Sequence, residues 1–178
     1  MYLTREPISI YDVILSPSCL SVDRQLGRRI SRSFAGSPRT GSASATDGND
    51  EQTFQCGASV LFFGIVRNHT EGRKVLYLEY EAYEKMADRM IRELIDFAFR
   101  HWPVETIHVL HRLGRVDLGE IAVAIDVRSA HRDEAYQASR YLIEEIKHNV
   151  PIWKKEYFED GTSEWSLCQS HAELSRSV

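Results

Sequence analysis

Apolar residues recur along this chain with two spacings, one typical of strands and one typical of helices. Residues 57–66 (GASVLFFGIV) are apolar on both faces and β-prone, which predicts a buried strand. Gly64 inside it predicts a bulge or a close approach of the backbone. Residues 75–83 (VLYLEYEAY) predict a second strand. The polar loop between them, 67–74 with Gly72 at its turn, favours a hairpin of the two strands.

Helical spacing begins at Glu84 and continues to about Trp102. The apolar positions of this segment repeat every three or four residues: Ala87, Met90, Ile91, Leu94 and Ala98. Pro103 disfavours helical conformation in the residue before it, so the helix is expected to end there. The pattern then predicts strands at 104–114 and 120–129, with a turn that Gly114 and Gly119 bracket.

A second amphipathic helix is predicted after these strands, with Ser129 as its N-cap. Its acidic first turn and its apolar stripe are Asp133 and Glu134, then Ala135, Ala138, Leu142 and Ile146. Asn149 is expected to adopt a left-handed conformation at the helix end, and Pro151 prevents continuation. Strands mixed with two main amphipathic helices argue for an α+β domain.

Composition divides the chain into four parts. An N-terminal lead-in at 1–19 has enough apolar character for a strand or a short helix, and a polar insert at 20–55 is predicted to be flexible. The folded domain is expected at 56–165, and a C-terminal tail at 166–178.

The overall charge limits the classes of ligand. The 178 residues carry a formal net charge of −4, with 43% hydrophobic and 27% charged residues. This is a globular composition without the basic excess of a general nucleic-acid binder, so any anion site must be local. No apolar run approaches a membrane span, and the N-terminus does not resemble a signal peptide. The three cysteines, Cys19, Cys56 and Cys168, fit a reducing compartment and a cytoplasmic location, without a zinc or disulfide framework.

Lysines flank an apolar core in KHNVPIWKKE, residues 147–156. Lys147 falls on the last helical turn and Lys154 in an extended segment after Pro151. Alternation along that segment puts Ile152, Lys154 and Glu156 on one side, and Trp153, Lys155 and Tyr157 on the other. If Trp153 and Tyr157 anchor into the core, Lys154 points toward a cleft or toward solvent. The lysines are either a solvated charged strip or part of an anion site, where a lysine of lowered pKa acts as acid, base or nucleophile.

Other cationic residues stand at the ends of predicted elements. Arg67 follows the first strand, as a structural arginine or a ligand-binding one. His131 and Arg132 begin the second helix, where free N–H groups favour anions, although they could equally face water. The roughly 24 Å along the helix between His131 and Lys147 separates them in a single chain. They belong to separate sites, the helix is broken, or a two-fold dimer brings them together.

His108 and His111 lie on a predicted strand at odd separation, so their side chains face opposite sides. They cannot easily share a metal ion, and neither is expected to be a metal ligand.

Five segments in this order resemble the catalytic (large, MoaE-type) subunit of molybdopterin synthase. They are GASVLFFGIVRNHTEGRKVLYLEYEAY, HRLGRVDLGE, SAHRDEAY, IKHNVPIWKKE and the DG before Trp165. The resemblance covers about residues 56–165. The insert at 20–55 and the tail after Trp165 depart from the family pattern, and no role is assigned to Arg176 in that tail.

The resemblance implies an α/β-hammerhead fold with a mixed sheet, and a homodimer of large subunits within a heterotetramer. A small ubiquitin-like sulfur-carrier subunit would present a Gly-Gly thiocarboxylate, and sulfur would pass to cyclic pyranopterin monophosphate. The family's catalytic lysines fall on Lys147 and Lys154, and its further substrate-binding residues on Arg67, His131, Arg132, Lys155 and Glu156. No cofactor or metal ion is expected.

Two other functions remain open from the sequence. One is a non-catalytic scaffold that binds a phosphorylated pterin or nucleotide, and the other is a module whose groove holds an extended C-terminal tail. Retention of both Lys147 and Lys154 favours the enzyme over a pure scaffold.

Overall fold

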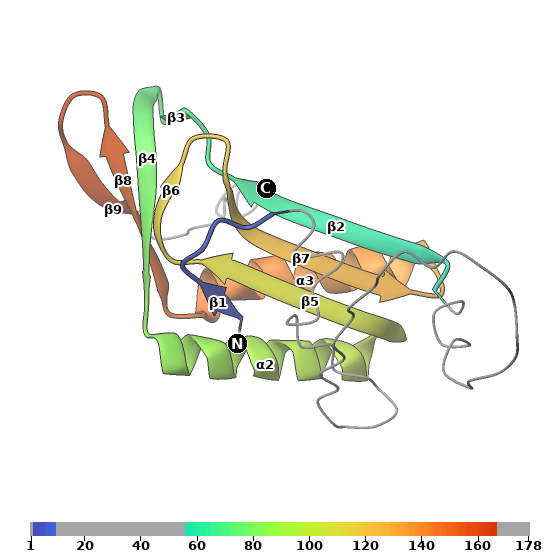
Figure 1. Cartoon of the computed structure of the whole chain (residues 1–178). Helices are drawn as coiled ribbons and strands as arrows, with labels where there is room; N and C mark the ends of the chain where they lie inside the picture. Colours follow the sequence, from blue (N-terminus) through green and yellow to red (C-terminus); the bar gives the residue numbers. More distant parts are fainter. Residues whose placement is uncertain (1, 10–55, 167–178) are drawn as a thin grey trace, which may run out of the picture.

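The computed structural model describes residues 2–9 and 56–166, which form two β-sheets and two long helices (Figure 1). A four-stranded sheet has the order β1 (Leu3–Thr4), β5 (Val104–Arg112), β7 (Ile121–Ser129), β2 (Ala58–Ile65). A five-stranded sheet has the order β3 (His69–Thr70), β4 (Arg73–Ala82), β8 (Ile152–Phe158), β9 (Ser163–Ser166), and β6 (Gly114–Asp117) also pairs with β4. The described pairings are antiparallel apart from that of β1 with β5.

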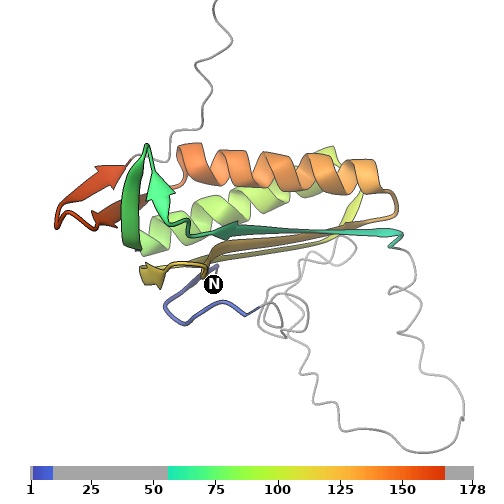
Figure 2. The same cartoon turned by 90° about the horizontal axis from the view of Figure 1, so that it is seen from above.

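Both helices, α2 (Glu84–His101) and α3 (Arg132–Asn149), cover the same face of the four-stranded sheet (Figure 2). The main hydrophobic core lies between these two layers and includes fully buried Ile91, Ile95, Ile107, Ile125 and Leu142. Burying each such side chain contributes about 1.5–3 kcal/mol to folding. The apolar periodicity of the two predicted helices is confirmed, because both stripes face this core.

The five-stranded sheet stands across one end of the four-stranded sheet, with β4 running across the direction of β2 (Figure 1). It has a smaller core of its own, in which Val75, Leu78, Val116 and Phe158 are buried. Tyr80 packs against both cores and so sits where the two sheets meet. The predicted α+β class with its α/β-hammerhead arrangement is confirmed.

Residues 57–66 and 75–83 do form strands, β2 and β4, but the predicted burial of the first strand and the predicted hairpin between the two are wrong. β2 is an edge strand that pairs with β7, and β4 belongs to the other sheet. Leu61 and Ile65 are exposed on the face away from the helices, while Phe63 on that face packs near buried Ile8. Apolar residues on both faces therefore mark a partly covered edge, and pairing between distant segments overrides the local hairpin signal.

Three local details also differ from expectation. The N-cap of α3 is His131, because Ser129 still belongs to β7; the Ser129 hydroxyl instead accepts a hydrogen bond from the His131 N–H at 3.2 Å. Asn149 is not left-handed, and the chain leaves α3 through extended Val150. The predicted turn between Gly114 and Gly119 contains the short strand β6, although both glycines have positive φ.

Gly64 leaves room for the side chain of Val123 on the neighbouring strand. A Cβ there would lie 2.6 Å from Val123 Cγ1 on the neighbouring strand, and the pairing register shifts between Gly64 and Ile65. The bulge that the sequence predicts at this glycine is confirmed, whereas its close neighbour is a side-chain methyl rather than backbone.

The lead-in contributes strand β1, which pairs parallel with the end of β5. The insert at 20–55, nearly all of the tail, Cys19 and Cys168 lie outside the described residues. Within residues 2–9 and 56–166, no helix combines the length and apolar character that crossing a bilayer requires.

Candidate active site

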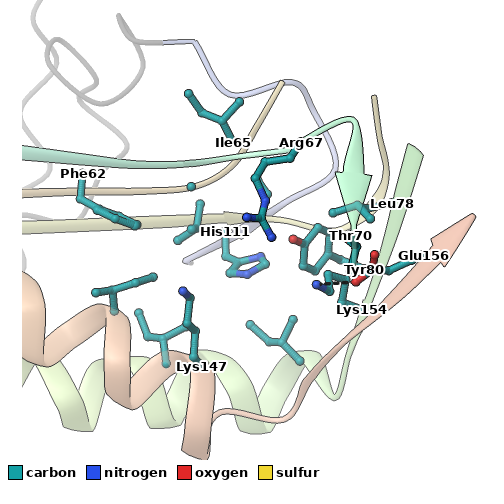
Figure 3. Close-up of a pocket in the computed structure, with 16 residues that line it drawn as sticks. Phe62, Ile65, Arg67, Thr70, Leu78, Tyr80, His111, Lys147, Lys154 and Glu156 are labelled. Atoms are coloured by element: carbon teal, nitrogen blue, oxygen red, sulfur yellow. Dashed lines mark ion pairs between the residues drawn. The ribbon is translucent and has the colours of Figure 1, made fainter. Parts of the chain in front are cut away.

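A cavity of about 340 Å³ lies where the two sheets meet α3 (Figure 3). One part of its wall is apolar, and the other carries charged and polar side chains. The polar lining is Arg67, Thr70, Tyr80, His111, Lys147, Lys154 and Glu156. The remaining lining is Phe62, Gly64, Ile65, Leu78, Ala122, Val123, Ile143, Ile146 and Ile152.

Lys147 and Lys154 reach this cavity from consecutive elements. Lys147 lies on the last turn of α3, and its exposed side chain stands at the mouth. The chain then turns through Pro151, whose carbonyl accepts a hydrogen bond from the Tyr83 N–H at 3.1 Å. This bond ties the connection to the start of α2, so the helix end and strand β8 keep a fixed relation. The two lysines, seven positions apart in sequence, thus face the same space.

Lys154 is held by an ion pair with Glu156, two residues further along β8. The Lys154 Nζ lies 2.8 Å from Glu156 Oε1, and the two side chains are 22% and 3% exposed. Residues two apart on a strand share a face, so the predicted grouping of Ile152, Lys154 and Glu156 is confirmed. The carboxylate orients the ammonium into the cavity and partly neutralises it.

Arg67 enters the cavity from the segment after β2. Backbone hydrogen bonds fix this segment: the Val66 N–H donates to Glu120 O at 3.1 Å, and the Gly119 N–H donates to Val66 O at 3.0 Å. The exposed Arg67 side chain points toward the same space as Lys147 and Lys154 (Figure 3). Three cations and one carboxylate make this cavity a local positive site in a chain of net negative charge.

His111 was missed as a cavity residue by sequence reasoning, which considered it only as a metal ligand. It ends an apolar run on β5, and its side chain is buried with the ring edge-on to Tyr80 at 5.1 Å. Burial lowers the pKa of His111 to about 4, although its hydrogen bond to the Arg112 carbonyl opposes that shift. Tyr80 and Thr70 were also missed; alternation along β4 was the available signal for Tyr80.

Lys155 lies outside the cavity, on the opposite face of β8. Its Nζ stands 5.2 Å from the Tyr157 ring centroid and 5.5 Å from that of Trp165. Trp153 on the same face is 42% exposed, so the condition that Trp153 and Tyr157 both anchor into the core is not met. The different placement of Lys154 and Lys155 is nevertheless as the alternation predicts. Lys155 could contact a ligand only if a ligand or a partner protein lay on the face of β8 that points away from the cavity.

His131 and Arg132 line a separate hollow at the start of α3, with Gly57, Ala130 and Asp133. α3 is an unbroken helix of 18 residues, which spans about 27 Å. This excludes the broken-helix alternative for bringing them to Lys147. Within one chain they stay apart from Lys147, and only another copy could bring them to the main cavity.

His108, the other histidine of β5, faces away from His111. It pairs in register with Asp126 on β7, and burial lowers its pKa. Burial also raises the pKa of the Cys56 thiol. The described residues hold no group of three His, Cys, Asp or Glu side chains arranged to bind a metal ion.

Comparison with known proteins identifies relatives of this fold and sequence. The family model described as MoaE protein matches residues 40–149. Over 110 residues the chain is 49% identical to the molybdopterin synthase catalytic subunit of Rattus norvegicus, covering 62% of this chain and 55% of that protein.

Solved structures of similar fold agree with the sequence match. The molybdopterin synthase structure from Staphylococcus aureus superposes with a TM-score of 0.60 at 46% identity, over 66% of this chain and 83% of that one. A complex of subunits 1 and 2 of molybdopterin-converting factor from Helicobacter pylori 26695 gives 0.56 at 25% identity, over 67% and 77%. The chain spans little more than half of the rat protein, but the family model matches more than half of this chain. The chain therefore belongs to the MoaE family.

Proposed function

We propose that this chain is the catalytic subunit of a cytoplasmic molybdopterin synthase. In this proposal a small ubiquitin-like carrier inserts its Gly-Gly thiocarboxylate into the cavity. Two such carriers in turn donate sulfur to cyclic pyranopterin monophosphate, which forms the dithiolene of molybdopterin. The names of the relatives and the chemistry of the cavity both support this sulfurtransferase activity.

The convergence of Lys147 and Lys154 on one cavity beside Arg67 carries the proposal. The substrate's phosphate calls for cationic donors, and a guanidinium suits a phosphate well. Once the carrier's sulfur is bonded to the substrate, water must cleave the acyl–sulfur bond and release the carrier as a carboxylate. Addition of that water builds negative charge on the acyl oxygen, which a fixed ammonium stabilises. We assign Lys147 and Lys154 as catalytic and Arg67 and Glu156 as substrate-binding residues. The carrier supplies the sulfur, so the chain needs no reactive cysteine.

The proposed assembly is a heterotetramer built on a dimer of this chain. The hollow with His131 and Arg132 holds two further cationic candidates that α3 keeps away from Lys147 of the same copy. In a two-fold dimer they would approach the cavity of the other copy and add to its substrate site.

A single-turnover assay tests the activity. Purified chain is mixed with thiocarboxylated carrier and cyclic pyranopterin monophosphate, and molybdopterin is measured for wild type, Lys147→Ala and Lys154→Ala. We expect either variant to lose most product formation while carrier affinity stays unchanged. Lys85→Ala, which removes an exposed lysine of α2, is the matched control and should retain full activity. A wild type that binds both ligands and forms nothing would instead indicate a scaffold.

Mixing two inactive variants tests the shared site. Arg132→Ala and Lys147→Ala should each be inactive if each removes one half of a site that two copies share. Random reassembly of the two variants should then restore roughly a quarter of wild-type activity, because half the dimers are mixed and each mixed dimer holds one intact site. Recovery of no activity from verified mixed dimers would refute the shared site. Full activity of a variant that cannot dimerise would refute it as well.

A further inference from the structure

His111 stands at the inner wall of the cavity, deeper than the exposed Arg67 and Lys147. Its side chain is 6% exposed, and its ring points into the space between those two cations (Figure 3). Neither the family resemblance nor the charge pattern assigns it a role. Its hydrogen bonding determines what it can offer a ligand.

The hydrogen bond at Nδ1 fixes the tautomer of His111. Nδ1 lies 2.9 Å from the backbone carbonyl oxygen of Arg112, which can only accept, so Nδ1 carries the proton. Burial keeps the ring neutral at pH 7, which leaves a lone pair on Nε2. Among the described residues no donor reaches Nε2, and the edge-on contact with Tyr80 fixes the ring plane.

This lone pair differs from the charged groups of the cavity, and unlike the rotatable hydroxyls of Thr70 and Tyr80 it can only accept. Arg67, Lys147 and Lys154 can only donate, and the Glu156 carboxylate holds Lys154. A carboxylate facing the ligand would repel a phosphate, but a neutral imidazole nitrogen accepts without adding negative charge. The cavity thus combines cations at its mouth with a fixed neutral acceptor deeper inside. That combination fits a ligand with an anionic end and an N–H or O–H donor on its other part.

We propose that His111 is a substrate-binding residue whose Nε2 accepts a hydrogen bond from an N–H or O–H group of the heterocycle, while the cations hold the phosphate. The identification of the ligand as a phosphorylated reduced pterin rests on the proposed function. The acceptor itself selects for the donor-bearing ring, because a site built to pair a donor rejects ligands that lack it.

Two substitutions distinguish loss of the Nε2 acceptor from loss of the hydrogen bond that Nδ1 donates to the Arg112 carbonyl. In His111→Asn the amide nitrogen can still donate to the Arg112 carbonyl, but nothing replaces Nε2. In His111→Gln the longer side chain can place its amide oxygen near the Nε2 position. Calorimetric titration should show that Asn weakens binding of cyclic pyranopterin monophosphate about tenfold or more, while Gln restores most of it. Binding of inorganic phosphate and of the carrier should not change in either variant.

A spectroscopic measurement on the wild type keeps the proposal testable if His111→Asn does not fold. With ¹⁵N-labelled histidine, the Nε2 resonance of His111, assigned by its loss in His111→Gln, should shift to lower frequency when the pterin binds. Inorganic phosphate alone should leave it in place. An unshifted resonance at pterin saturation would overturn the proposal.

The outcomes distinguish this inference from the proposed function. If wild type, His111→Asn and His111→Gln bind the pterin with equal affinity, the proposed role of His111 is overturned, even if all three proteins make product. Conversely, a wild type that binds the pterin through Nε2 but forms no product would refute the sulfur-transfer activity and keep the acceptor. A wild type that does not bind the pterin would refute both.

Discussion

Acidification should destabilise this protein through the buried imidazole of His111. An unfolded histidine has a pKa of about 6.5, whereas burial lowers the pKa of His111 to about 4. Between these two values the unfolded chain binds more protons than the native one, so the free energy of unfolding falls as pH falls. The part of the free energy of unfolding that depends on a neutral His111 is fully present above pH 6.5 and lost by about pH 4. A difference of about 2.5 pKa units corresponds to about 3 kcal/mol at 1.36 kcal/mol per unit.

Urea unfolding at a series of pH values from 7.5 to 4 measures this loss. Wild type should lose about 3 kcal/mol more unfolding free energy over the range than His111→Gln, whose amide does not titrate. His108, whose pKa burial also lowers, is present in both proteins, so its contribution cancels in the comparison. Parallel pH profiles of wild type and variant would show that the native imidazole titrates as in water, which would refute the argument.

Three further substitutions test the cavity and the core. Glu156→Gln removes the carboxylate that holds Lys154, so single-turnover product formation should slow by roughly tenfold to a hundredfold with carrier affinity retained; an unchanged rate would show that Lys154 needs no anchor. Gly64→Ala places a Cβ 2.6 Å from Val123 Cγ1 and should lower the free energy of unfolding in urea by about 1–3 kcal/mol; an unchanged free energy would show that β2 and β7 accommodate the methyl group without strain. Ile125→Ala empties a fully buried position of β7 and should cost about 2–5 kcal/mol by the same measurement, and a cost under 1 kcal/mol would contradict the packing described.

The helices and their buried faces were predictable because they depend on local spacing. Ile91 and Leu142 stand on apolar stripes that any window of the sequence reveals, and both are fully buried. The partner of β2 was not predictable, since β2 and β4 are close in sequence but belong to different sheets. Strand pairing depends on contacts between distant segments, and a short loop between two strands cannot exclude them.

The same distinction applies to the cavity. Lys154 could be assigned a side by alternation, since that depends only on local geometry. The role of His111 as a cavity wall depends on β5, β4 and α3 meeting in space, and no short motif encodes that meeting. The separation of His131 from Lys147 could be worked out, because helix length is a direct function of residue number.

The short connection from α3 to β8 has an even–odd constraint on its length. The hydrogen bond at Pro151 and the pairing with β4 fix both of its ends, so β8 cannot rotate to accommodate a change. Removing one residue from this connection would turn Lys155 into the cavity, and adding one would turn Trp153 inward. The residue count of this connection can therefore change only in ways that preserve parity, while buried Val150 and the turn at Pro151 limit its composition as well.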